Sequence, residues 1–144
     1  MIYNQDFIWL HFPKCAGTKV AEIIRNYFSK TEGLFQDPVG VAADPTIAWH
    51  DAVSDRMSKD PGFDPGQRTI ITSFRRLLPW LISRYNFEVQ RSPHLDHRPE
   101  LLLEGKFLEA NGRIGHTDGY IRKYLSDSVL QAGRVEFIRT EYFE

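Results

Sequence analysis

The sequence predicts an α/β fold of three layers, in which a mostly parallel sheet is flanked by helices. Short apolar segments typical of buried strands alternate along the chain with segments of helical periodicity, which favours parallel strands joined by helices. The chain has 144 residues, 42% of them hydrophobic, and this suffices for a substantial core. We therefore expect residues 1–144 to form a single domain.

The chain is expected to open with a strand followed by a helix. Residues 7–12 form a continuous apolar run, the pattern of a strand buried on both faces, and the run ends at Pro13. After Thr18, whose hydroxyl can cap a helix, apolar residues recur at helical spacing. These residues are Val20, Ile23, Ile24, Tyr27 and Phe28.

The rest of the chain repeats this alternation. Further strands are predicted at residues 46–50, 69–74 and 135–139. Helices are predicted from about Pro79 to Phe87, over residues 99–110 and over residues 117–131. The polar, turn-rich segments between them predict loops at residues 54–68 and 88–98.

The charge balance and the cysteine count exclude several classes of protein. The formal net charge is -1, with 18 basic and 19 acidic side chains, so no nucleic-acid partner is expected. The single cysteine, Cys15, excludes an intrachain disulfide and a cysteine-based metal cluster. No apolar run reaches the length of a transmembrane helix, so we expect no membrane span and a cytoplasmic location.

The turn between the first strand and its helix is suited to bind an anion. The first N–H groups of a helix lack intrahelical partners, and the helix dipole adds partial positive charge there. Lys14 adds a full charge, Gly17 lets a ligand approach the backbone, and Thr18 adds a hydroxyl. The alternative is an ordinary turn with a surface lysine. The predicted binding residues are Pro13, Lys14, Cys15, Ala16, Gly17, Thr18 and Lys19.

A second motif follows the predicted strand at residues 69–74. Arg75 falls at the carboxyl end of this strand, the edge at which α/β sheets bind their ligands. Ser83 lies in the next predicted helix, which can pack back on the sheet. An arginine fork and a hydroxyl together suit a terminal phosphate, so both residues are predicted to bind the same ligand as the first turn.

Both motifs resemble ligand sites of the sulfotransferases that use 3′-phosphoadenosine 5′-phosphosulfate (PAPS). Residues 11–18, His-Phe-Pro-Lys-Cys-Ala-Gly-Thr, resemble the 5′-phosphosulfate loop, in particular that of the membrane-associated, carbohydrate-modifying branch and its bacterial relatives. Arg75, with Ser83 eight residues later, is similar to the 3′-phosphate site of the family. Arg76 and Leu77 stand where the family commonly has Asp-Pro.

The resemblance implies a P-loop-NTPase-like sulfotransferase fold, shortened at its C-terminus because relatives continue into further helices. It also implies PAPS as the donor substrate, a carbohydrate or other small acceptor with a hydroxyl or amine, and no metal. Lys14 would stabilise the charge left on the 5′-phosphate. His50, at the end of a predicted strand, is the predicted general base, and the alternative is a histidine without a catalytic role.

Two other functions stay open. A P-loop-like small-molecule kinase would also bind nucleotide phosphates at this edge of the sheet, but the Walker order is missing because Lys14 precedes Gly17. A non-catalytic nucleotide-binding module would keep the anion site and lack the base or the acceptor cleft.

Overall fold

The computed structural model describes residues 1–28, 30, 33–37, 49–131 and 134–142. Its strands are β1 (Ile2–Tyr3), β2 (Phe7–Leu10), β3 (Phe35–Gln36), β4 (Thr69–Phe74), β5 (Lys106–Leu108), β6 (Ile114–His116) and β7 (Val135–Arg139). Its α-helices are α1 (Gly17–Phe28), α2 (Val53–Lys59), α3 (Leu77–Arg91), α4 (Thr117–Tyr124) and α5 (Asp127–Gln131). Two short 3-10 helices are η1 (Pro99–Glu104) and η2 (Thr140–Tyr142).

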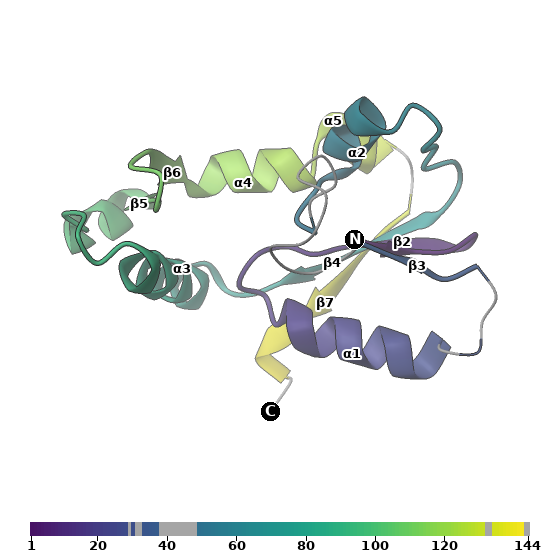
Figure 1. Ribbon diagram of the computed structural model, residues 1–144, viewed down its shortest axis with the longest axis horizontal. Helices are drawn as coiled ribbons and strands as arrows, with labels where there is room; N and C mark the ends of the chain where they lie inside the picture. Colours follow the sequence, from purple (N-terminus) through teal and green to yellow (C-terminus); the bar gives the residue numbers. More distant parts are fainter. Residues whose placement is uncertain (29, 31–32, 38–48, 132–133, 143–144) are drawn as a thin grey trace.

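Five strands form the main sheet, in the order β3-β1-β2-β4-β7 (Figure 1). Its centre is parallel, because β4 pairs in parallel with β2 and with β7. Strand β1 is antiparallel to both β2 and β3, and β5 and β6 form a separate antiparallel pair. The sheet is therefore mixed, and the prediction of a mostly parallel sheet in a P-loop-NTPase-like sulfotransferase fold is wrong.

A tight turn at Asn4 explains the unpredicted strand β1. The side-chain oxygen of Asn4 accepts hydrogen bonds from the backbone N–H groups of Asp6 and Phe7, both at 2.9 Å. Asparagine favours such turns because its side chain mimics a backbone carbonyl. The chain thus folds back on itself, and Ile2 lies opposite Trp9 in the antiparallel register.

Helices cover both faces of the main sheet, with α1 on one face and α2 and α5 on the other (Figure 1). Successive residues of a strand point to opposite faces, so Trp9 packs with Val20 and Ile24 of α1. Ile8 and Leu10 belong to the core on the other face. That core includes Val53 of α2 and Val129 of α5. The fully buried strand β2 is thereby fixed between two apolar layers.

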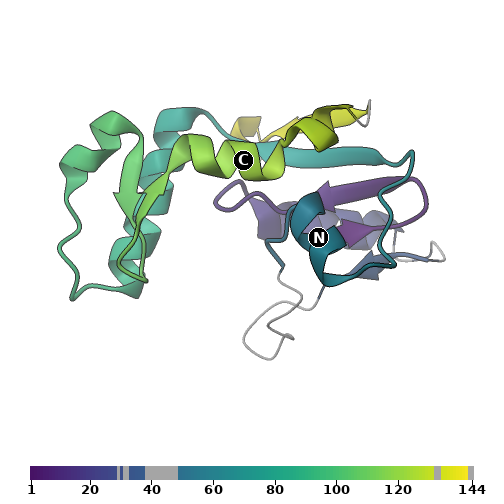
Figure 2. The same cartoon turned by 90° about the horizontal axis from the view of Figure 1, so that it is seen from above.

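The remaining elements lie beyond the carboxyl ends of the parallel strands. Helix α3, η1 and the β5–β6 pair are set apart from the sheet, and α4 leads back to it (Figures 1 and 2). Aromatic rings join the two parts, since Phe12 at the end of β2 contacts the rings of Trp80 and Tyr124 at 5.7 and 4.9 Å. No helix in the described part of the chain is long and apolar enough to cross a membrane.

Some of the strands, helices and loops predicted from the sequence are confirmed and others are wrong. The strands at residues 69–74 and 135–139 are confirmed as β4 and β7, and the helix after the first strand is confirmed as α1, which begins at Gly17. The predicted loop at 54–68 is wrong in its first part, which is α2. Its start is stabilised by a hydrogen bond from the Ala52 N–H to the Asp55 carboxylate.

Four further predictions need correction. Residues 46–48 of the predicted strand lie outside the described residues, and Trp49 and His50 form a turn. The predicted helix at 99–110 is instead η1 followed by β5, because Gly105 ends the turn in the left-handed region with a φ of 68°. The predicted loop at 88–98 is helical as far as Arg91. The predicted helix at 117–131 is divided into α4 and α5.

Candidate functional site

A cleft of about 600 Å³ opens where β2, β4 and β7 end. Residues that follow these three strands line it together with one face of α3 and the turn at His50. We call it the cationic cleft. Its lining residues are His11, Pro13, Lys14, Ala16, Gly17, Thr18, Lys19, His50, Arg75, Ser83, Arg84, Phe87 and Thr140.

The cleft gathers the predicted site residues from four places in the chain. Residues 13–19 contribute every predicted residue except Cys15, and they are joined by Arg75 directly after β4, Ser83 on α3 and His50 in the turn before α2. Carboxyl ends of neighbouring parallel strands meet at one edge of a sheet, so β2 and β4 bring the first two motifs together.

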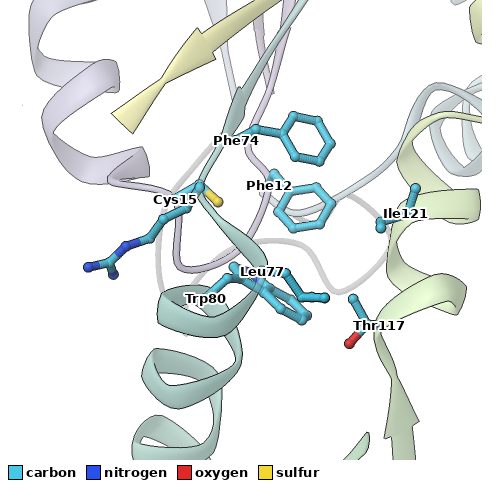
Figure 3. A pocket seen from close by; sticks show the side chains of 8 residues that line it. Phe12, Cys15, Phe74, Leu77, Trp80, Thr117 and Ile121 are labelled. Carbon is cyan, nitrogen blue, oxygen red and sulfur yellow. The ribbon is translucent and has the colours of Figure 1, made fainter. Parts of the chain in front are cut away.

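Cys15 does not line this cleft. Its side chain is buried and instead lines a small, mostly apolar pocket of about 80 Å³ between α3 and α4, near Phe74 and Trp80 (Figure 3). Burial raises the pKa of the Cys15 thiol to about 12, so the thiol is neutral at pH 7. The Cys15 side chain therefore fills the space behind the loop and does not face the cleft.

The backbone of the loop at residues 13–19 presents free donors. Lys14 and Ala16 adopt positive φ angles of 63° and 53°, which non-glycine residues seldom do and which occur at ligand-binding loops. The first hydrogen bond at the start of α1 runs from the Val20 N–H to the Ala16 carbonyl. The N–H groups of residues 17–19 find no acceptor among the described residues, so they are free for an anion.

Side chains on α3 hold this loop in place. The indole Nε1 of the buried Trp80 donates a hydrogen bond of 2.8 Å to the Pro13 carbonyl. The ammonium of Lys14 lies 4.5 Å from the centroid of the Phe87 ring, a cation–π contact across the cleft. The contacts of Trp80 and Phe87 therefore couple the position of the loop to α3.

Cationic side chains gather in the cleft although the chain is nearly neutral. Four of them line it, Lys14, Lys19, Arg75 and Arg84, of which Lys19 pairs with Glu22 and Arg84 with Glu88, and no Asp or Glu is among its lining residues within the described chain. Arg75 is exposed and pairs with no carboxylate of the described residues. Such a surface attracts a ligand with several negative charges.

Arg84 is a site residue that the sequence analysis did not assign. Its guanidinium forms a 2.7 Å ion pair with the buried Glu88 and donates a hydrogen bond of 2.9 Å to the Tyr120 hydroxyl. The rings of Phe107 and Tyr120 each lie 5.3 Å from its central carbon. The i,i+4 spacing of Arg84 and Glu88 was the available signal, but Glu88 fell in a predicted loop.

Two imidazoles lie together at one end of the cleft. The ring centroids of His11 and His50 are 4.3 Å apart, and the ring of Trp9 stacks on His11 at 5.4 Å. His11 is only 9% exposed, and burial, with a smaller effect from His50, lowers its pKa to about 3. His11 is therefore neutral at physiological pH.

His50 has the tautomer that a general base requires. Its Nδ1 lies 3.1 Å from the backbone carbonyl of His11, which can only accept a hydrogen bond, so Nδ1 carries the proton and Nε2 has a free lone pair. Desolvation by the surrounding protein lowers the pKa of His50, which keeps it unprotonated at pH 7. The neighbouring Asp51 forms a 2.7 Å ion pair with Lys59, so its carboxylate contributes to α2.

Metal-binding groups do not converge in the described part of the chain, where no three His, Cys, Asp or Glu side chains lie close enough to share an ion.

Comparisons with known proteins gave no match. No protein-family model matches this chain, and neither the curated proteins nor the solved structures contain one that matches it.

Proposed function

We propose that this protein is a sulfotransferase that moves a sulfuryl group from PAPS to a hydroxyl or amine of a glycan or other small acceptor. The observation that supports the proposal is the convergence of the loop at 13–19, Arg75, Ser83 and a neutral histidine on one cationic cleft. The cleft suits a nucleotide that carries anionic groups at both its 5′ and 3′ positions.

Each end of the donor has a matching set of residues. The free N–H groups at the start of α1 and the ammonium of Lys14 suit the 5′-phosphosulfate. Arg75 and Ser83 suit the 3′-phosphate, because neither an ion pair of Arg75 nor a hydrogen bond of the Ser83 hydroxyl occupies them among the described residues. The residues present therefore fit the donor.

When bound, PAPS supplies an activated sulfuryl group. His50 Nε2 accepts the proton of the acceptor hydroxyl while the acceptor oxygen forms its bond to sulfur and the bond from sulfur to the 5′-phosphate oxygen breaks. Lys14 and the N–H groups of α1 stabilise the negative charge that develops on the departing phosphate. The proton thus passes to His50, and the electron pair of the broken bond stays on the phosphate oxygen.

Calorimetric titration with adenosine 3′,5′-bisphosphate tests the donor site directly. We expect binding that weakens at least tenfold in Arg75→Ala, about 1.4 kcal/mol, because the 3′-phosphate loses its charge partner. Arg113→Ala is the matched control, since Arg113 is exposed in the turn before β6 and lies outside the cleft. Equal binding of ATP with magnesium would favour a kinase, and no binding of the bisphosphate would refute the proposal.

Sulfate transfer from PAPS to a panel of sugar and phenol acceptors tests the chemistry. His50→Ala is expected to abolish transfer while bisphosphate binding persists, and a wild-type protein that binds but never transfers would be a non-catalytic module. Lys14→Ala is expected to lower kcat more than it weakens bisphosphate binding, whereas equal losses would make Lys14 a binding group only.

We further propose a cytoplasmic location, where the single thiol of Cys15 stays reduced.

A further inference from the structure

The predicted base lies on a turn, where the backbone has no helix or sheet ladder to fix it. Trp49 and His50 form this turn just before α2. The orientation of the His50 ring therefore depends on individual contacts with neighbouring elements. The imidazole itself is held on one side by the carbonyl of His11.

The second contact comes from the C-terminal half of the chain. The hydroxyl of Tyr124, the last residue of α4, donates a hydrogen bond of 2.6 Å to the backbone carbonyl of His50. Tyr124 is 1% exposed, and its ring packs 4.9 Å from the ring of Phe12. The packing of the Tyr124 ring thus fixes the position from which its hydroxyl donates to the turn.

We infer that Tyr124 is a positioning residue for His50. Its hydroxyl anchors the turn at the His50 carbonyl, so that Nδ1 stays on the His11 carbonyl and Nε2 stays available to the cleft. The positioning itself is independent of the reaction, and only its effect on catalysis rests on the proposed function. Helix α4 thereby becomes part of the active-site framework, although Tyr124 does not line the cleft.

Burial is consistent with a donor role for this hydroxyl. Desolvation raises the pKa of Tyr124, so the phenol stays protonated at neutral pH and can donate. Loss of the hydroxyl would leave the His50 carbonyl without this donor, and the backbone of the turn would then be held by the hydrogen bond of 3.1 Å from the Met1 ammonium to the Trp49 carbonyl.

Tyr124→Phe tests the inference because it removes the hydroxyl and keeps the packed ring. Nitrogen NMR of the imidazole should show one Nδ1–H tautomer of His50 in the wild type and a mixture in the variant. We expect kcat for sulfate transfer to fall roughly 10- to 100-fold through misorientation of the base, with bisphosphate affinity within about twofold.

Tyr85→Phe is the matched control. The Tyr85 hydroxyl also donates to a backbone carbonyl, that of His97 at 3.0 Å, but it lies outside the cationic cleft. This variant should keep both the His50 tautomer and kcat. An unchanged tautomer and kcat in Tyr124→Phe would overturn the inference. So would a wild-type His50 protonated at Nε2, a result that needs no variant to fold. A wild type that has the expected tautomer but binds no bisphosphate would refute the proposed function alone.

Discussion

The imidazole of His11 fills the space that a Cβ atom would need on Gly17. An ideal Cβ built at Gly17 would lie 1.7 Å from Nε2 of His11 and 1.9 Å from its Cδ2. The glycine was expected to let a ligand approach the backbone, and the structure shows that it admits a histidine side chain. This contact locks the first residue of α1 to the end of β2.

Gly17→Ala is expected to destabilise the protein, because the added methyl group must displace the buried His11 ring or the start of α1. Overpacking of this kind costs about 1–3 kcal/mol, and bisphosphate binding should weaken in parallel. Gly119→Ala is the control, since its Cβ would meet nothing closer than 4.0 Å inside α4. That variant should gain about 0.5–1 kcal/mol. Urea unfolding of both measures the contrast, and a Gly17→Ala protein as stable as the wild type would contradict it.

The parts of the fold that were predicted from sequence are those with a strong local signal. The apolar runs of β2 and β4 reflect strands inside the sheet, and the helical spacing of apolar residues in α1 reflects burial of one stripe of that helix. Strands β1 and β3 have two residues each, too few to show alternation, and their antiparallel pairing depends on contacts distant in sequence. The mixed sheet could not be derived for that reason.

The candidate site was predictable where it follows from the parallel centre of the sheet. Lys14 and Arg75 follow neighbouring parallel strands, so their meeting is a consequence of topology. The direction of the Cys15 side chain was not predictable, because it depends on the positive φ angles of the residues on either side. Arg84 was missed because its burial depends on Tyr120 and on Glu88, which was assigned to a loop.

Acid is expected to destabilise the protein through His11. Its pKa is about 3 in the folded protein and about 6.5 in an unfolded chain, so between these values the unfolded state binds more protons. The free energy of unfolding therefore falls as the pH falls, by about 1.4 kcal/mol per pH unit well below pH 6.5. His11→Asn should lose about 2 kcal/mol less than the wild type between pH 7 and pH 5. Urea unfolding at both pH values measures this difference. His94→Asn, in an exposed loop, should keep the wild-type dependence.

The ion pair of Arg84 with Glu88 is expected to matter far more than that of Lys19 with Glu22. Both pairs lie on helices, at 2.7 and 3.2 Å, but the side chains of Arg84 and Glu88 are 11% and 2% exposed and those of Lys19 and Glu22 are 61% and 53% exposed. Glu88→Ala leaves a buried cation unpaired and should cost about 3–5 kcal/mol. Glu22→Ala should cost less than about 0.5 kcal/mol. Similar losses in chemical unfolding would show that burial does not separate the two pairs.

Trp80 is expected to connect stability with ligand binding. Trp80→Phe removes the hydrogen bond from Nε1 to the Pro13 carbonyl and should cost about 1–3 kcal/mol, since a buried carbonyl loses its donor. Because this carbonyl begins the loop that we propose to bind the 5′-phosphosulfate, bisphosphate affinity should fall roughly fivefold, about 1 kcal/mol. Thr72→Val is the control, because it removes a buried hydrogen bond to the Leu10 carbonyl, within the sheet. It should lower the free energy of unfolding and leave bisphosphate affinity, measured by calorimetry, unchanged. Equal affinity in the wild type and Trp80→Phe would mean that the loop keeps its shape without the indole.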